Sequence, residues 1–136
     1  MEEVLKKYIE KGREAIFFIS RLFIGLLFLQ HGAQKLFGWF GGTAVSSWFS
    51  LMGLAGVIEF FGGLALAVGL FTRLAALGGL ATMISAYFIA HFPNGWVPIM
   101  NKGELAVLYF AAFLILIIYG AGKFSLERAL FKKEIF

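Results

Sequence analysis

The sequence contains no cysteine and few charged residues, and each shortage excludes a class of protein. Of its 136 residues, only 15% are charged whereas 60% are hydrophobic. A soluble domain typically carries about 25% charged and about 45–50% apolar residues, so a soluble globule, a disordered tail and a nucleic-acid-binding domain are excluded. Without cysteine, the chain forms no disulfide, thiolate nucleophile or cysteine-ligated metal centre. The composition predicts an integral membrane protein.

Long apolar runs account for more than half of the chain, and they predict its fold class. A helix needs about 20 residues to cross a bilayer, and strands are excluded because lipid-exposed sheet edges are not tolerated. The sequence therefore predicts one transmembrane domain, residues 1–136, that folds as an all-α membrane protein, an antiparallel bundle of four transmembrane helices. The predicted spans are residues 15–37, 52–71, 74–92 and 103–122.

Segments outside the spans predict three further features. The first 14 residues carry apolar side chains on one face and Glu/Lys pairs at i,i+4 on the other, which favours an N-terminal interfacial helix. In the first outer loop, apolar side chains between Val45 and Met52 recur at helical spacing behind Thr43, which predicts a short amphipathic helix. Thr72, in the short joint between the second and third spans, is placed to cap the third helix.

The basic residues predict the orientation of the spans. Lysine and arginine concentrate in cytoplasmic loops, and all three tryptophans fall on the side with few basic residues, where indole rings favour the headgroup boundary. We therefore expect a multi-pass protein of the cell membrane with both termini in the cytoplasm. The side holding the termini has Lys6, Lys7, Lys11, Arg13, Arg73, Lys123, Arg128, Lys132 and Lys133, against Lys35 and Lys102 on the other.

Ionisable residues inside the spans carry the functional signal, because a charge near the bilayer centre costs roughly 2.5–3.5 kcal/mol and needs a partner or a task. Glu59 shares its helix face with Gly62 and Gly63, small residues that allow close helix approach. We predict the same helix-packing role for Gly32 in the first span. His31 lies at a depth similar to that of Glu59. We predict that Glu59 and His31 form a catalytic, proton-handling pair, with a purely structural pair as the alternative.

Four further residues are predicted to bind substrate. Arg21 and Lys35 lie on the inward face of the first span, with anchoring of the helix at the membrane edges as the alternative role for each. His91 and Glu104 lie near the outer ends of the third and fourth spans, with capping of a helix end beside Tyr87 as the alternative role for His91. The histidines and glutamates are suitable metal ligands, but no ligand-spacing motif connects them, so no metal site is predicted.

Four segments of the sequence carry a family resemblance: RLFIGLLFLQHGAQKLFGWFGG, EFFGGLALAVGLFTRLAAL, NKGELAVLYF and GAGKFSLERAL. In these segments the chain resembles the DoxX family of small four-span membrane proteins. The resemblance extends from Arg21 to about Arg128. It implies a four-helix membrane bundle and an association with quinone-linked thiosulfate oxidation, membrane oxidoreductase complexes and oxidative-stress responses. The residues that match the family's motifs are Arg21, His31, Gly32, Lys35, Glu59, Gly62 and Gly63, with Glu104 as a weaker match.

Our leading hypothesis is a membrane subunit of a redox system that binds a quinone-like head group in the outer half of the bundle. Glu59 and His31 handle protons, and Lys35 or Arg21 polarises a carbonyl or binds an anionic substrate. A soluble or membrane redox partner completes the electron path, and whether the chain is itself an enzyme stays open. The alternatives are a non-enzymatic scaffold or assembly factor and a small-solute transporter, which four helices support only as a homo-oligomer.

Overall fold

The computed structural model describes all 136 residues, which form helices and connecting loops without any strand. Three helical segments are long and apolar enough to cross a membrane, namely Glu2–Phe37, Leu51–Val68 and Thr72–Asn94, and a fourth apolar helix is shorter. The prediction of an all-α membrane protein is therefore confirmed. The elements are α1 (Glu2–Phe37), α2 (Leu51–Val68), α3 (Thr72–Ala86), a π-helical turn (Tyr87–His91), a 3-10 turn (Phe92–Asn94), α4 (Pro98–Asn101), α5 (Glu104–Tyr119) and α6 (Leu126–Phe131).

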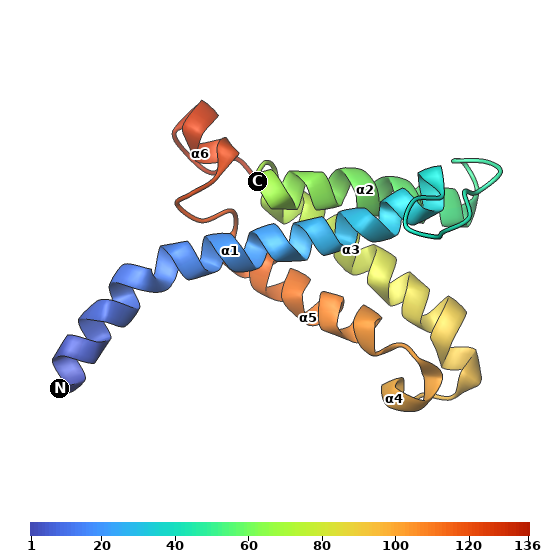
Figure 1. Cartoon of the computed structure of the whole chain (residues 1–136), viewed down its shortest axis with the longest axis horizontal. Helices are drawn as coiled ribbons and strands as arrows, with labels where there is room; N and C mark the ends of the chain where they lie inside the picture. Colours follow the sequence, from blue (N-terminus) through green and yellow to red (C-terminus); the bar gives the residue numbers. More distant parts are fainter.

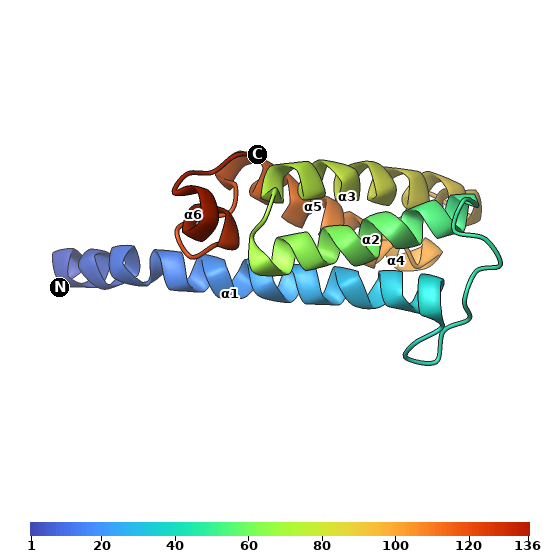
Figure 2. The same ribbon diagram turned by 90° about the horizontal axis from the view of Figure 1, so that it is seen from above.

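The long helices pack mainly in two pairs. α1 lies beside α2, and α3 lies beside α5, with the second pair crossing the first at an angle (Figure 1). The N-terminal part of α1 projects beyond the other helices, as the turned view also shows (Figure 2). We call the end where α2 turns into α3 the termini end, because both chain ends lie toward it, and the opposite end, with residues 38–50 and 92–103, the loop end.

The core lies where the four long helices meet, and aromatic rings fill its centre. The Phe28 ring of α1 lies 4.8 Å from Phe113 and 5.3 Å from Tyr109, measured between centroids, and both partners belong to α5. Aliphatic residues of α2, α3 and α5 surround these rings. Many other large apolar side chains face outward, which suits a surface that contacts lipid. The aliphatic members of the core are Leu66, Ala76, Met83, Ala106 and Leu116.

Glycines set the close approach of α1 to α2. A Cβ atom built on Gly63 would lie 2.7 Å from the carbonyl oxygen of Gly25, and one on Gly32 would lie 2.7 Å from that of Gly56. A Cβ on Gly62 would meet nothing closer than 3.9 Å. Gly62 therefore faces α1 and α3 at ordinary contact distance, through Phe28 and Ala75, whereas Gly32 and Gly63 lie in the seam between α1 and α2 and set their close approach.

We expect Gly63→Ala to lower the melting temperature in detergent strongly, because the new methyl group collides with the backbone of α1. Overpacking of a tight interior site costs about 1–3 kcal/mol. The matched control Gly62→Ala has space for its methyl group and gains up to about 1 kcal/mol in helix propensity, so its melting temperature should stay level or rise. Thermal unfolding followed by circular dichroism measures both, and equal losses would show that the seam is misplaced.

Two of the predicted short helices are not formed as expected. The first 14 residues do not make a separate interfacial helix, because α1 runs without a break from Glu2 to Phe37. The first loop contains no helix between residues 38 and 50. Gly38 and Gly41 adopt positive φ angles there, and the Trp48 ring packs 5.8 Å from the Phe37 ring instead of lying on a helical stripe.

The cap predicted at Thr72 is also wrong. The N-cap of α3 is Phe71, with φ at 48°, and the buried hydroxyl of Thr72 has no hydrogen-bond partner. Instead, the carboxylate of Glu127 in α6 accepts a 2.8 Å hydrogen bond from the Phe71 N–H. A carboxylate at a helix N-terminus is favourable because the helix dipole is positive there. The C-terminal segment thus caps α3 from a distance in sequence.

Candidate functional site

The ionisable groups of α1 and α2 meet as a close ion pair. The Lys35 ammonium lies 2.6 Å from the Glu59 carboxylate, and Glu59 is almost fully buried. Lys35 therefore turns toward the core rather than to the membrane edge, which was the alternative expected from its position. Gly56 allows this, because the Cβ of Lys35 lies directly over the position that a side chain at residue 56 would occupy. The stem of Lys35 thus crosses α2 to reach the carboxylate.

An apolar cavity of about 590 Å³ opens beside this ion pair, between α2 and α3. Both Lys35 and Glu59 line it, and His91 lines it toward the loop end. Ser85 adds a hydroxyl that donates no hydrogen bond within the protein, whereas the Thr82 hydroxyl donates to the Gly78 carbonyl at 2.8 Å. The remaining walls are aliphatic: Leu51, Met52, Leu54, Ala55, Ile58, Ala81, Ala86, Ile89 and Ala90. We call this cavity the α2–α3 groove.

His31 is not the partner of Glu59. No hydrogen bond joins the two, and the imidazole instead meets the Tyr109 ring edge-to-face at 5.9 Å. His31 also lies outside the lining of the α2–α3 groove. The predicted Glu59–His31 pair is therefore replaced by Glu59–Lys35, because the faces of the helices, and not only their depth, decide which groups meet.

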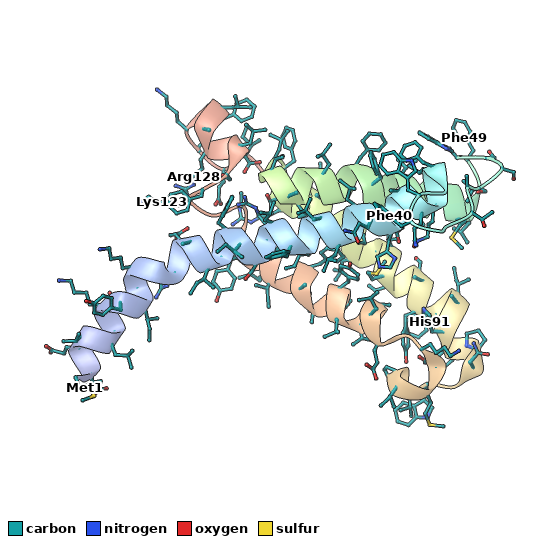
Figure 3. All side chains as sticks on the ribbon, viewed as in Figure 1. Met1, Phe40, Phe49, His91, Lys123 and Arg128 are labelled. Carbon is teal, nitrogen blue, oxygen red and sulfur yellow. The ribbon has the colours of Figure 1, made fainter.

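The residues predicted near the loop end separate into two environments. His91 lies in the π-helical turn, at the far end of the molecule from Lys123 and Arg128 (Figure 3). Its Nδ1 atom lies 3.1 Å from the main-chain oxygen of Asn101, which fixes the ring at the mouth of the groove. Glu104 is exposed in the first turn of α5 and lines neither large cavity. His91 thus joins the Lys35–Glu59 site and Glu104 does not.

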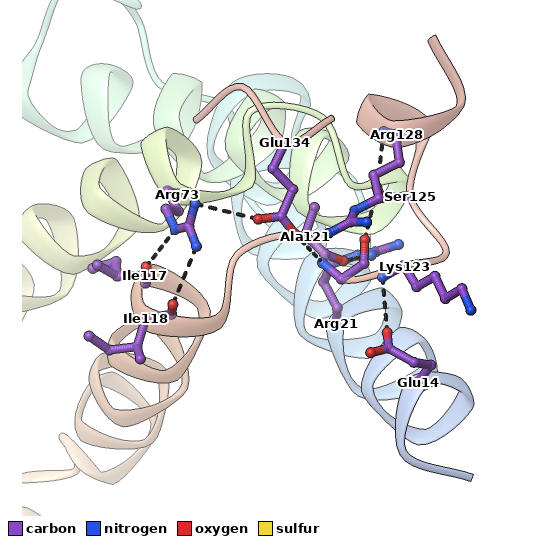
Figure 4. A network of polar contacts seen from close by, with 11 residues as sticks. Glu14, Arg21, Arg73, Ile117, Ile118, Ala121, Lys123, Ser125, Arg128 and Glu134 are labelled. Carbon is purple, nitrogen blue, oxygen red and sulfur yellow. Dashed lines mark hydrogen bonds and ion pairs between the residues drawn. The ribbon is translucent and has the colours of Figure 1, made fainter. Parts of the chain in front are cut away.

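Arg21 lies far from this site, near the termini end, and its guanidinium is fully engaged. Its Nε donates to the Leu66 carbonyl at 3.0 Å, and its two terminal nitrogens donate to the carbonyls of Ala121 and Phe124, the latter at 2.9 Å. The close view shows it among the polar contacts of the C-terminal segment (Figure 4). Arg21 is nearly inaccessible, so this geometry favours a structural role over the predicted substrate binding.

Tyr109 is a site-adjacent residue that the sequence analysis missed. Its ring is buried against Phe28 and His31, and its hydroxyl has no hydrogen-bond partner in the protein. The only signal in the sequence is that Tyr109 is one of two tyrosines in a largely apolar span, which is common where a tyrosine merely packs. No group of three or more histidine, aspartate or glutamate side chains lies close enough together to hold a metal ion.

Comparison with known proteins agrees with the resemblance noted in the sequence. A family model described as DoxX matches residues 16–92. A protein of Haemophilus influenzae, described only as uncharacterized, is 37% identical over 133 residues, which covers 92% of this chain and 98% of that protein. The inner membrane protein YqjF of Escherichia coli is 31% identical over 124 residues, which covers 85% of this chain and 92% of its own length. No solved structure matches.

Proposed function

Because this chain belongs to the DoxX family, we propose that it is the integral membrane subunit of a redox system that binds a quinone-like substrate. In this proposal all four long helices cross the bilayer as an antiparallel bundle. The excess of lysine and arginine at the termini end supports a cytoplasmic location for both termini. The inner-membrane description of the Escherichia coli relative is consistent with this placement.

One observation carries the proposal, namely the ion pair at the wall of an apolar groove. A quinone has two carbonyl oxygens on a flat apolar ring and a long apolar tail. The groove matches these features, since its walls are aliphatic and its polar groups are few and convergent. The Lys35 ammonium is placed to donate a hydrogen bond to a carbonyl oxygen, and His91 lies at the mouth for a second polar contact.

The chemistry assigned to the chain is proton transfer. Reduction of a quinone to a quinol takes up two electrons and two protons, and the electrons come from a partner oxidoreductase. Glu59 is the proton-transfer group of the proposal, because its carboxylate lines the groove and its only ionic partner is Lys35. Glu59 receives a proton from the Lys35 ammonium, which leaves both groups neutral, and passes it to the reduced substrate. One proton taken up from the aqueous side then restores the ion pair, so that no lone charge persists at membrane depth.

We expect decylubiquinone to bind the purified protein in lipid nanodiscs, and Ala55→Trp to weaken this binding at least about tenfold, which corresponds to about 1.4 kcal/mol. The indole fills the groove that Ala55 lines. The control Leu64→Trp adds the same ring to an exposed position of α2 outside the groove and should bind as the native protein does. Binding is measured by equilibrium dialysis, because the added tryptophans would alter any signal from intrinsic fluorescence.

Equal affinity in the groove variant and the control would contradict the groove as the binding site. Absence of binding in the native protein, together with constant co-purification of one client protein, would favour the scaffold hypothesis instead. Solute uptake by proteoliposomes that contain this protein alone would favour the transporter.

A further inference from the structure

A second, larger cavity lies at the termini end, between α1 and α5. It encloses about 830 Å³ and has no part in the α2–α3 groove. It forms because α1 and α5 touch over only a short stretch, and α1 continues past the C-terminal end of α5 toward its own N-terminus (Figure 1). Its walls are mostly apolar, with Ile9, Ile16, Phe17 and Ile24 from α1 and Ile115 and Leu116 from α5. We call it the α1–α5 wedge.

Apolar walls of this kind require an apolar filling when the protein is in a membrane. Water gains few hydrogen bonds in such a space, because only a minority of the lining atoms are polar. The wedge is open along its side, and its walls belong to helices whose outer faces carry exposed apolar side chains. A lipid acyl chain is therefore the filling that the surroundings supply.

The rim of the wedge adds a charge preference. Arg13 lines the wedge, is exposed and has no carboxylate within ion-pair distance. Glu14 is already engaged, since its carboxylate accepts a 2.9 Å hydrogen bond from the Lys123 N–H. That contact uses the main-chain N–H of Lys123, whose side chain does not line the wedge. Arg21 contributes little attraction, because its guanidinium is saturated by carbonyls.

We propose that the α1–α5 wedge is a binding site for an anionic phospholipid. One acyl chain lies between α1 and α5, and the phosphate lies at the rim beside Arg13. A free arginine at the edge of an apolar cavity favours an anionic over a zwitterionic headgroup, because basic side chains near a membrane surface attract anionic lipids. This inference does not rest on the redox proposal, since the two cavities share no lining residue.

The test is native mass spectrometry and thermal unfolding of the full chain with added phosphatidylglycerol or phosphatidylcholine. We expect phosphatidylglycerol to remain as a one-to-one adduct and to raise the melting temperature more than phosphatidylcholine does. Arg13→Gln should weaken phosphatidylglycerol binding about fivefold, the size expected for one basic side chain near a headgroup. Ala112→Trp, which fills the wedge from α5, should remove the adduct.

Two matched controls separate this site from general effects. Lys133→Gln removes one positive charge outside the wedge, and Ala111→Trp adds the same ring to an exposed position of α5 that does not line it. Both should keep the adduct, and inorganic phosphate alone should give no stabilisation. Equal binding of the two phospholipids, equal losses in Arg13→Gln and Lys133→Gln, or a lipid-free dimer in the spectra would overturn the proposal. Decylubiquinone binding should be unchanged in Arg13→Gln, so failure here is distinguishable from failure of the redox proposal.

Discussion

Glu59→Gln is expected to lower quinone reduction by about 10²–10⁴-fold, the range that a positioned acid–base group contributes. Glutamine keeps the shape of the side chain and loses the ability to carry a proton. The variant should retain its helix content but unfold more easily, because it leaves Lys35 as an unpaired charge at a partly buried site. Removal of one partner from a buried pair costs about 3–5 kcal/mol. Native membranes from cells that carry only the variant provide the activity measurement.

A double variant separates the chemical from the structural role of the pair. Lys35→Met with Glu59→Gln removes both charges and leaves no unpaired ion, so stability should return close to the native value. Activity should stay as low as in Glu59→Gln, since residues that act as one unit are not additive. The control is Glu104→Gln, which neutralises an exposed glutamate outside the groove and should change neither property.

The opposite results are equally clear. Full turnover in Glu59→Gln would exclude proton transfer by this residue. Recovery of both stability and activity in the double variant would show that the pair only holds α1 against α2, as the structural alternative requires. A double variant that is stable and inactive but still binds decylubiquinone would place the defect in the chemistry and not in binding.

The apolar spans were predictable because a segment of that length and composition is stable in a membrane only as a helix. The second span was expected at residues 52–71 and is observed as α2, Leu51–Val68, and the third was expected at 74–92 and is observed over Thr72–Asn94. The ends are less predictable, since they depend on local capping. The second span ends early at Gly69, whose φ of 74° stops the helix, and no apolar pattern signals that position.

The partner of Glu59 was not predictable from depth alone. His31 and Lys35 are one helical turn apart on α1, so both lie within reach of a carboxylate at that level. The choice depends on how α1 is rotated against α2, and that rotation is set by the seam at Gly25, Gly32 and Gly63. Hydrophobic patterns locate such a seam to within a face of the helix, whereas selecting one of two neighbouring polar groups requires the packed structure.

The contacts of the C-terminal segment were the most difficult to predict from the sequence, because they join residues about a hundred positions apart. In the sequence, Arg21 is a charged residue inside a predicted span. Such a residue usually binds a ligand or anchors the helix at the membrane edge. Its actual partners are main-chain carbonyls at the end of α2 and between α5 and α6. Every residue has a main-chain carbonyl group, so the sequence does not indicate which carbonyls accept a hydrogen bond from Arg21.

Because Arg21 makes these contacts, we expect Arg21→Met to destabilise the protein severely. Methionine fills similar apolar space but leaves the Leu66, Ala121 and Phe124 carbonyls without their donor. A buried acceptor left unpaired costs about 1–3 kcal/mol. The loss at the buried Leu66 and Ala121 carbonyls, with the part-buried one of Phe124, is therefore large against the whole stability of a small domain, about 5–15 kcal/mol. Hydrogen exchange should show the segment from Gly120 to Phe131 losing protection first, because Arg21 connects that segment to α1.

Arg73 supplies the matched control for this experiment. It also donates to carbonyls, those of Ile117 and Ile118 at 2.9 and 3.4 Å, and pairs with Glu134 at 3.5 Å. Its side chain is 34% exposed, whereas Arg21 is 1% exposed, so water replaces the lost donor in Arg73→Met and the melting temperature should fall far less. Arg21→Lys should lie between the two, since one ammonium cannot span three carbonyls as a planar guanidinium does. A stable Arg21→Lys that no longer binds substrate would instead return Arg21 to the binding role first inferred for it.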